Sequence, residues 1–470
     1  MATRLQKFSV TGLFGLYSHT INLCTDLHIT AIIGPNGLGK TVCLKLIEAL
    51  FARNYSFFLQ VQFESAEYVF TSGEVVLVKQ TAETIRLKES PKHRYGGDAQ
   101  QNPFPHSVRS IEFTYKGASG SHKSWKPVNF EMFARRMRRW PERNVPWLRQ
   151  IAPEMWIDER NGRRYATEEL SQFYPRLLQR ELFQSSEENA PQDFTKLISQ
   201  NPCHLIETQR LLVLPTADDD EPWNGVHGRG TQSQLVVQKK AETLREIIQS
   251  VLSQYANLSQ SRDRTFPQRV ISETKQKTLT EQQLRDRLQS LDDQRQSLIN
   301  AGILDADIEP VTFEEGFIQA SLFPVLEIYI RDNEEKLKVF DALLAKINVF
   351  RKIVNGRFLD KKLEIDRKTG FRITNSAGRE VPVDKLSSGE QHQLVIAFDL
   401  LFEVKENSLI LIDEPELSLH VIWQKAFVGS LTEIIKLNPF DVVLATHSPL
   451  VVSRHHDIVV ELGDVGDLGE

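Results

Sequence analysis

The chain has 470 residues, of which 40% are hydrophobic and 25% charged, a composition typical of a globular protein with two or three domains. Its formal net charge of −5 gives no global sign of nucleic-acid binding, so any such role must come from a local patch. The sequence contains no apolar run near the ~18 residues of a membrane helix and no signal-peptide core. The cysteines lie far apart without a C-x-x-C pair, which argues against disulfides and zinc. We therefore expect a cytoplasmic protein without a membrane partner.

Alternating apolar residues in the first part of the chain predict short strands at 7–10, 21–23 and 29–33. The last of these precedes a glycine-rich loop and a helix with one apolar face over 42–51. This loop fits G-x-x-x-x-G-K-[ST] and consists of Gly34, Pro35, Asn36, Gly37, Leu38, Gly39, Lys40 and Thr41. A strand, such a loop and a helix N-terminus form a phosphate-binding loop, so we predict a bound nucleoside triphosphate. Lys40 is expected to bind the β- and γ-phosphates, and Thr41 a Mg²⁺ ion.

Further along, arginines crowd the stretch 131–165, among them Arg135, Arg136, Arg138 and Arg139 beside Trp140. Arginines interleaved with aromatic residues suit nucleic-acid phosphates or the acidic surface of a partner protein. Acidic residues also occur in this stretch, so a solvated helix face is an equally good interpretation. We assign a basic subdomain to about 131–180 within an N-terminal part that covers 1–232.

From 233 to 350 the apolar residues recur at spacings of three and four, which predicts long helices. Examples of this pattern are Leu244, Ile248, Leu284, Leu288, Leu291, Phe340, Leu343 and Ile347. Such helices form either an antiparallel coiled-coil arm that turns near 300–310 or a helical bundle that packs on the rest of the protein. The remaining segment, 351–470, returns to strand patterns at 362–365, 371–374, 380–383, 409–412 and 442–445, with a helix from 390 to about 404.

A second anion-binding helix N-terminus is predicted at the sequence Leu-Ser-Ser-Gly-Glu. Ser387 is a good N-cap, Ser388 follows it, and Gly389 allows close approach of a ligand to the backbone. Because Lys40 already provides one phosphate site, this second site is best explained if it binds the γ-phosphate of a nucleotide held by another subunit. We therefore expect a homo-oligomer, at least a dimer.

Acidic residues end the next apolar strand. Asp413 at the strand end can hold Mg²⁺, and Glu414 can act as the general base that activates the attacking water. The strand at 442–445 is followed by His447, which can hydrogen-bond the γ-phosphate. On its own a histidine is more often structural, but here it follows the other motifs in order and spacing.

These motifs, G-P-N-G-L-G-K-T, L-S-S-G-E, L-I-D-E-P-E-x-x-L-H and A-T-H-S-P, resemble those of the SMC-type branch of the ABC ATPases. They cover both ends of the chain, 1–90 and 360–455. The resemblance implies an α/β P-loop ATPase lobe that is split by a helical insertion, with ATP and Mg²⁺ as ligands. A glutamine before the insertion contacts the Mg²⁺ and the attacking water in that family. Gln209 is the candidate here, and Gln80 is the alternative.

The architecture is also similar to the stand-alone ATPases of bacterial anti-phage systems, Septu first and PARIS second. That resemblance implies an ATPase that oligomerises and controls a separate nuclease subunit of the HNH or Toprim type, with DNA or a phage product as the possible trigger. The sequence lacks a zinc hook, and its arm is far shorter than in chromosome-organising SMC proteins. A DNA-repair ATPase of the RecF or SMC-like kind, or a scaffold stabilised by ATP with little turnover, are the alternatives.

Overall fold

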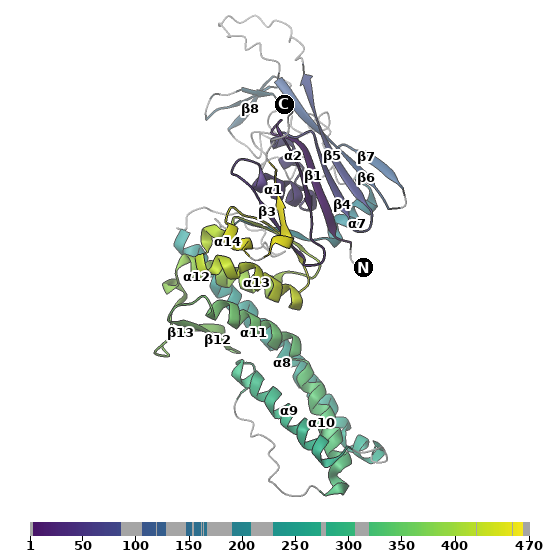
Figure 1. The fold of residues 1–470 in the computed structure, drawn as a ribbon, viewed down its shortest axis with the longest axis vertical. Coiled ribbons are helices and arrows are strands. Elements are labelled where there is room, and N and C mark those ends of the chain that lie inside the picture. The colour runs from purple at the N-terminus through teal and green to yellow at the C-terminus, as the bar shows by residue number, and fades with distance from the viewer. Residues whose placement is uncertain are drawn as a thin grey trace, which may run out of the picture. The chain divides into compact units, whose positions relative to one another are not determined.

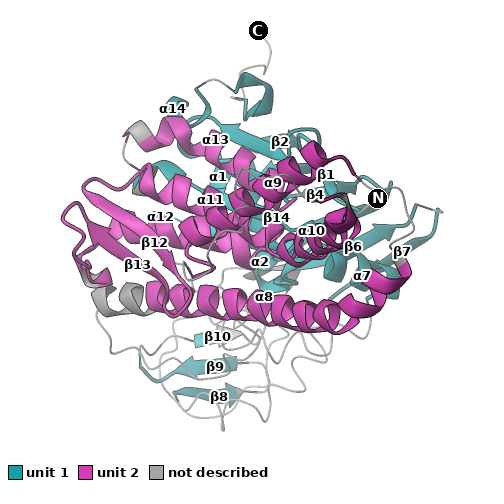
Figure 2. Ribbon diagram, turned by 90° about the horizontal axis from the view of Figure 1, so that it is seen from below, with its two compact units in different colours: residues 1–208, 405–417, 440–470 teal, residues 209–404, 418–439 magenta. Residues whose placement is uncertain are grey.

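The computed structural model describes residues 3–85, 106–118, 120–127, 147–152, 155–160, 162, 164–166, 190–207, 229–273, 279–305, 319–419, 421–453 and 455–463. The described part of the chain divides into two compact units (Figure 2). Unit 1 contains 1–208, 405–417 and 440–470, whereas unit 2 contains 209–404 and 418–439. The chain thus leaves unit 1 after 208, returns to it for 405–417, enters unit 2 again for 418–439 and ends in unit 1. This confirms the predicted α/β lobe with a helical insertion, but unit 2 also includes 351–404 and 418–439, which lie outside the predicted insertion at 233–350.

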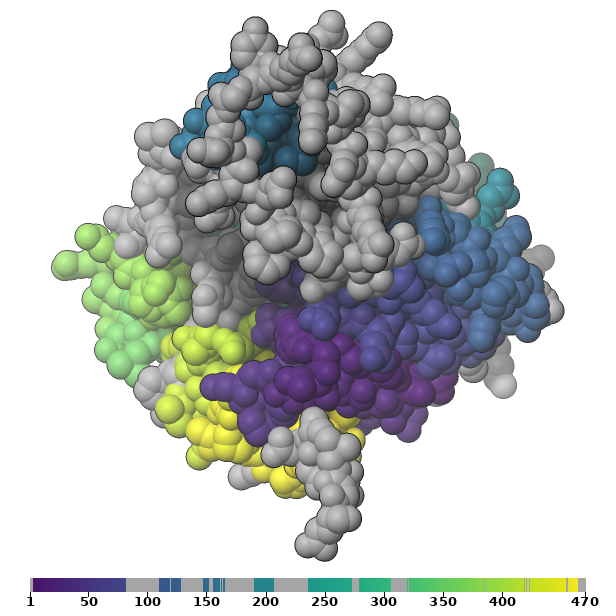
Figure 3. Space-filling model, turned by 90° about the horizontal axis from the view of Figure 1, so that it is seen from above, coloured from purple at the N-terminus to yellow at the C-terminus, as the bar shows by residue number. Residues whose placement is uncertain are grey.

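A five-stranded parallel sheet forms the centre of unit 1. Its strand order is β11 (Cys203–Glu207), β14 (Leu409–Asp413), β15 (Asp441–Ala445), β3 (Ile29–Ile33) and β16 (Val459–Glu461). Nearly continuous apolar runs form its central strands because a parallel sheet is covered on both faces. In this order the N-terminal strand β3 lies between β15 and β16, which come from the C-terminal part of the chain (Figure 1). On the face shown in Figure 3, purple N-terminal and yellow C-terminal residues adjoin.

A six-stranded antiparallel sheet makes up the second layer of unit 1. Its order is β2 (Tyr17–Asn22), β1 (Leu5–Leu13), β4 (Ser65–Phe70), β5 (Val75–Ile85), β6 (His106–Lys116) and β7 (His122–Trp125). Alternate residues of β4 are buried, as the pleat requires, whereas register shifts in β1 space its buried residues two or three positions apart. Their apolar side chains join helices α1 (Lys40–Phe51), α2 (Tyr55–Gln60) and α7 (Gln192–Gln200) in one core.

The remaining elements of unit 1 are small. A three-stranded sheet contains β8 (Leu148–Ala152), β9 (Met155–Asp158) and β10 (Arg164–Ala166), and β9 pairs with β10 in antiparallel orientation. Helix α14 (Pro449–Val452) follows β15, and short 3₁₀ turns cover Pro415–Ser418 and His456–Ile458. Arg135, Arg136, Arg138 and Arg139 lie outside the described residues.

Unit 2 is mainly helical. Its helices are α8 (Arg229–Glu273), α9 (Glu281–Asn300), α10 (Phe323–Lys338), α11 (Asp341–Asn355), α12 (Ser388–Phe398) and α13 (Val421–Leu437). A hairpin of β12 (Lys361–Asp366) and β13 (Gly370–Asn375) precedes α12, and 3₁₀ turns occur at Ala320–Leu322 and Val383–Lys385. Leu284, Leu288 and Leu291 are buried, as their spacing predicts. None of the helices in the described ranges has the length and apolar character needed to cross a membrane.

Ion pairs connect the antiparallel helices α8 and α10. Lys336 Nζ lies 2.7 Å from Asp263 Oδ1. The Arg269 guanidinium forms a bidentate ion pair with Asp332, whose side chain is 5% exposed. Helix α9 adds Arg287, whose Nε donates to Glu334 at 2.8 Å. Only the Arg269–Asp332 pair is largely buried, and removing either of its partners would leave an uncompensated charge, so this pair favours one register of α8 and α10 over others.

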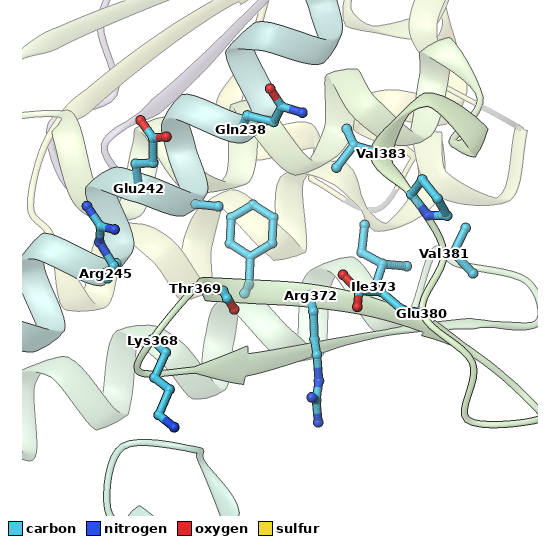
Figure 4. A pocket seen from close by; sticks show the side chains of 13 residues that line it. Gln238, Glu242, Arg245, Lys368, Thr369, Arg372, Ile373, Glu380, Val381 and Val383 are labelled. Carbon is cyan, nitrogen blue, oxygen red and sulfur yellow. The ribbon is translucent and has the colours of Figure 1, made fainter.

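The β12–β13 hairpin rests on α8. A Cβ atom on Gly370 would lie 1.9 Å from the Ala241 carbonyl oxygen, so only glycine fits at this position. Gly370 also has a φ of 82°, a backbone conformation that other residues rarely adopt. Beside this contact is a pocket of about 340 Å³ between α8, the hairpin and residues 380–383 (Figure 4). These residues do not form the predicted strand, since Glu380 makes a single bridge to Thr374 and a 3₁₀ turn begins at Val383. The charged ends of Lys368 and Arg372 point away from α8, and Arg372 instead pairs with Glu364 at 3.2 Å.

Candidate functional site

The loop between β3 and α1 has the backbone that an anion site needs. Gly34, Gly37 and Gly39 have φ values of 151°, 90° and 87°, which side chains rarely allow. A Cβ on Gly39 would also lie 2.7 Å from Leu13 Cδ2, so a larger residue there would in addition displace the Leu13 side chain. Helix α1 starts without a side-chain cap and without an acidic residue in its first turn. Its N-terminal amides and positive dipole end therefore suit a phosphate.

The ammonium group of Lys40 lies across this loop. Its Nζ donates to the carbonyl oxygens of Gly34 at 2.6 Å and Pro35 at 2.8 Å. Burial lowers the pKa of Lys40, while the carboxylates of Glu414, Glu416 and Asp413 oppose that shift. A cation held by neutral carbonyls and facing several carboxylates is placed to bind phosphate oxygens and, with them, a metal cation.

Thr41 and Asp413 meet at the end of the central strands. Thr41 Oγ1 donates to Asp413 Oδ1 over 3.1 Å, although the two residues come from opposite ends of the chain. Hydroxyl and carboxylate oxygens are the ligands that Mg²⁺ prefers, usually completed by water and phosphate oxygens. Within the described ranges, there is no cluster of three or more His, Cys, Asp or Glu residues arranged to hold a metal. The residues present therefore fit Mg²⁺ bound together with a nucleotide.

The predicted base and the predicted histidine also come together. Glu414 Oε1 lies 3.6 Å from His447 Nε2, and about a third of each side chain is exposed. Glu414 has a left-handed φ of 49°, and its amide donates to the Ala445 carbonyl oxygen at 2.8 Å. Such a backbone conformation costs free energy and occurs often at functional sites. Here it turns the chain directly after Asp413, so that two successive carboxylates face the same edge of the sheet.

Two residues that the sequence analysis did not single out support the phosphate loop from the β1–β2 side. His19 Nε2 lies 2.7 Å from the Leu38 carbonyl oxygen, and its ring stacks on Tyr17 at 5.9 Å. Burial lowers the pKa of His19, so the neutral ring donates through Nε2. Phe14 is 41% exposed with a φ of 57°, and its Cε2 lies 3.2 Å from a Cβ built on Gly39.

The N-terminus of α12 in unit 2 forms a capping box, and Ser387 is its N-cap, as the sequence predicted. Ser387 Oγ accepts from the Glu390 amide at 3.3 Å, and Glu390 Oε2 accepts from the Ser387 amide at 2.8 Å. Burial alone would raise the pKa of Glu390, but hydrogen bonds from Lys361 and Ser387 hold this pKa below its usual value. Gly389 lies within the first turn, and Ser387 and Ser388 are exposed.

The glutamine candidates have different outcomes. Gln209 lies outside the described residues, two positions beyond β11, whose last residue Glu207 is the register partner of Asp413. Gln80 is not placed at the phosphate loop. Its amide donates to the carbonyl oxygens of Phe58 at 2.7 Å and Val61 at 2.8 Å, and accepts from the Phe63 amide at 3.2 Å. These bonds use the whole side chain, so Gln80 has a structural role.

Comparisons with known proteins bear mainly on the C-terminal motifs. A family model described as "AAA domain, putative AbiEii toxin, Type IV TA system" matches residues 227–453, which include Ser387, Asp413, Glu414 and His447. Protein ea59 of Escherichia phage lambda is 37% identical over 70 residues. The aligned stretch spans 15% of this chain and only 13% of the phage protein.

Two solved structures of SMC heads were also matched. One is an SMC head bound to the C-winged helix domain of ScpA, with 13% identity and a TM-score of 0.30 over 96% of this chain and 91% of that chain. The other is the SMC head domain from Thermotoga maritima, with 10% identity and a TM-score of 0.29 over the same shares. TM-scores of this size add no weight to the fold described above.

The phosphate loop after β3, with Asp413 and Glu414 at the end of β14 in the same parallel sheet, defines a P-loop nucleotide-binding lobe. The family model described as an AAA domain, which covers the C-terminal motifs, agrees with this class.

Proposed function

We propose that the protein binds ATP with Mg²⁺ in unit 1 and hydrolyses it. The observation that carries this proposal is the contact of Thr41 with Asp413, because it brings the phosphate loop and the acidic strand end into one site. Lys40 binds the phosphates, and Thr41 and Asp413 are the Mg²⁺ ligands. A Mg²⁺ ion held by these two side chains would supply polarisation of the phosphate oxygens and neutralise part of their charge.

The remaining steps fall to side chains at the same sheet edge. Glu414 accepts a proton from the attacking water, and His447 donates a hydrogen bond to the γ-phosphate. The 3.6 Å between Glu414 Oε1 and His447 Nε2 keeps the proton acceptor and the hydrogen-bond donor next to each other. Gln209 is proposed to add a contact to the Mg²⁺ and the water after β11, since that strand pairs with β14 in parallel.

Oligomerisation is part of the proposal. The exposed N-terminus of α12, with Ser387, Ser388 and Gly389, is a second anion site in unit 2. In SMC-type ATPases this motif binds the nucleotide of another subunit, so we propose a homo-oligomer of at least two copies that closes on ATP. ATP hydrolysis then opens it.

We further propose that closure controls a separate nuclease of the HNH or Toprim type in anti-phage defence. The support is the resemblance of the motifs and architecture to the ATPases of such systems. The matched family description, which names a putative toxin of a toxin–antitoxin system, is compatible with a role against infection. DNA or a phage product is the proposed trigger.

The test uses the purified chain alone and together with the nuclease encoded beside it. We expect slow Mg²⁺-dependent release of phosphate by the chain alone, ATP-dependent dimers or larger species by native mass spectrometry, and nucleic-acid cleavage only when the nuclease is present. ATP binding without any turnover would favour an ATP-stabilised scaffold. A recombination nuclease as the partner would favour a DNA-repair ATPase.

A further inference from the structure

Glu416 connects the two loops that carry Glu414 and His447. It lies in the 3₁₀ turn at Pro415–Ser418, directly after the β14 strand end. Its Oε2 accepts from the Thr446 hydroxyl at 2.7 Å, and its Oε1 accepts from the His447 amide at 2.6 Å. Each oxygen of one carboxylate thus holds a successive residue of the loop after β15.

The other bonds of that loop show what Glu416 adds. The Thr446 amide donates to the Ile32 carbonyl oxygen at 3.0 Å, which continues the sheet pairing onto β3. The fully buried Thr446 hydroxyl also accepts from the Ser448 amide at 3.0 Å. The residue between them, His447, leaves the sheet at this point, and its amide donates to Glu416. The loop is therefore anchored on both sides, with the carboxylate at its centre.

We infer that Glu416 is a positioning residue, which clamps the loop after β15 so that the His447 ring stays beside Glu414. The inference rests on the proposed ATPase function. Bidentate acceptance by a carboxylate combines short hydrogen bonds with a defined direction, so it fixes the backbone of His447 more firmly than one bond would. Geometry at a reacting centre matters strongly, since a displacement of about 1 Å can cost roughly 100-fold in rate.

A second explanation is that Glu416 matters through its charge. Its carboxylate is among those that face Lys40, so it also influences the ammonium group electrostatically. Two substitutions distinguish these explanations. Glu416→Gln keeps the length and an oxygen that can accept from the His447 amide, but it removes the charge. Its NH₂ group only donates, so the Thr446 hydroxyl would have to accept from it instead of donating. Glu416→Asp keeps the charge but is one methylene too short to span both partners.

The experiment measures two quantities on the full chain. The first is hydrogen–deuterium exchange at the His447 amide without nucleotide, and the second is the single-turnover rate of ATP hydrolysis, with ATP affinity measured in parallel. We expect Glu416→Asp and Glu416→Ala to speed exchange at His447 about five- to tenfold, as the loss of one hydrogen bond implies. The same variants are expected to lower the rate about 10- to 100-fold with ATP affinity nearly unchanged. Glu416→Gln should stay close to the wild type in both measurements.

Each outcome decides between the explanations. If Glu416→Gln is as slow as Glu416→Ala while His447 remains protected, charge and not position is the role of Glu416. If none of the variants changes exchange at His447, the clamp does not exist. A wild-type chain that binds but does not hydrolyse ATP would remove the proposed function, yet the exchange measurement would still test the clamp. Thr446→Val, with Thr446→Ser as its hydroxyl-keeping control, tests the other end of the same contact.

Discussion

Thr41 and Asp413 are separated by 372 positions in the chain, yet the hydroxyl of one donates to the carboxylate of the other over 3.1 Å. The contact exists because β3 and β14 lie in one parallel sheet with only β15 between them. The carboxyl ends of parallel strands meet at one edge of a sheet, which is where ligands of such folds bind. The following predictions test the site at this edge and the helical unit.

The first prediction concerns Lys40. Lys40→Ala removes the ammonium group that the phosphate loop directs at the phosphates, so we expect ATP affinity to fall by at least about 100-fold. Isothermal titration calorimetry measures this loss. Lys7→Ala removes an equal charge from a partly exposed strand position in the same unit and serves as the control. Equal affinities of Lys40→Ala and the wild type would show that the nucleotide binds elsewhere.

The second prediction separates binding from hydrolysis. Glu414→Gln keeps the shape of the side chain but cannot accept the proton of water, so ATP should bind and persist. The single-turnover rate is expected to fall about 10²- to 10⁴-fold, the usual contribution of a general base. Rapid-quench measurements on enzyme in excess over ATP determine it. Hydrolysis at the wild-type rate would mean that another group takes the proton.

The third prediction addresses closure between subunits. Ser387→Arg places a long side chain at the exposed N-terminus of α12, so ATP-dependent assembly should be lost while ATP binding at Lys40 remains. Native mass spectrometry in the Glu414→Gln background, where ATP persists, reads out assembly. Ser387→Asn is the matched control because asparagine also caps helices well. Assembly of the arginine variant that equals the control would argue against a role of this motif in trans.

The fourth prediction concerns a buried cluster of charges in unit 2. Lys240 Nζ on α8 lies 2.8 Å from Asp399 Oδ1 and 2.7 Å from Glu403 Oε2, in the π-helical turn after α12. Burial raises the pKa of Asp399 to about 7, although Lys240 acts against that shift. Lys240→Met leaves two carboxylates without their cation, so the free energy of unfolding should fall by about 3–5 kcal/mol.

This loss should depend on pH. A carboxyl whose pKa is higher in the folded state favours folding below its unfolded pKa near 4, and that contribution disappears as the pH rises through about 7. Lys240→Met should therefore be less stable at pH 8 than at pH 5.5, by more than the wild type is. Urea unfolding at both pH values measures the difference, and Asp399→Asn added to Lys240→Met should restore stability at pH 8. A pH-independent loss would point to lost packing of the lysine stem instead.

The parts of the site that are continuous in sequence were predictable. The strand, loop and helix around Lys40 carry their own signal, and so does the apolar strand that ends in Asp413. The roles of His19 and Glu416 were not, because their partners Leu38 and His447 come from loops that only the folded sheet brings near.

In the fold too, features that are local in sequence were predictable, and contacts between distant segments were not. The helical periods at Leu284 and Leu288 predicted buried faces correctly. The insertion of β1 between β2 and β4, and the pairing of β16 with β3, depend on long-range partners that local patterns do not specify. Helix α8 also runs on through Pro267, where a local interpretation would end or kink it.

The position of β3 in its sheet has a consequence for synthesis of the protein. Ile29 pairs with Val442, and Ala31 with Val459. Both edges of β3 therefore stay unpaired until these C-terminal residues have been synthesised. At about 5–20 residues per second, the ribosome needs roughly 20–80 s to supply those partners. During that interval an apolar strand has two unpaired edges, a state prone to aggregation. The lobe therefore stays incomplete until those partners have been synthesised, and we expect its yield in cells to depend on chaperones that bind nascent chains.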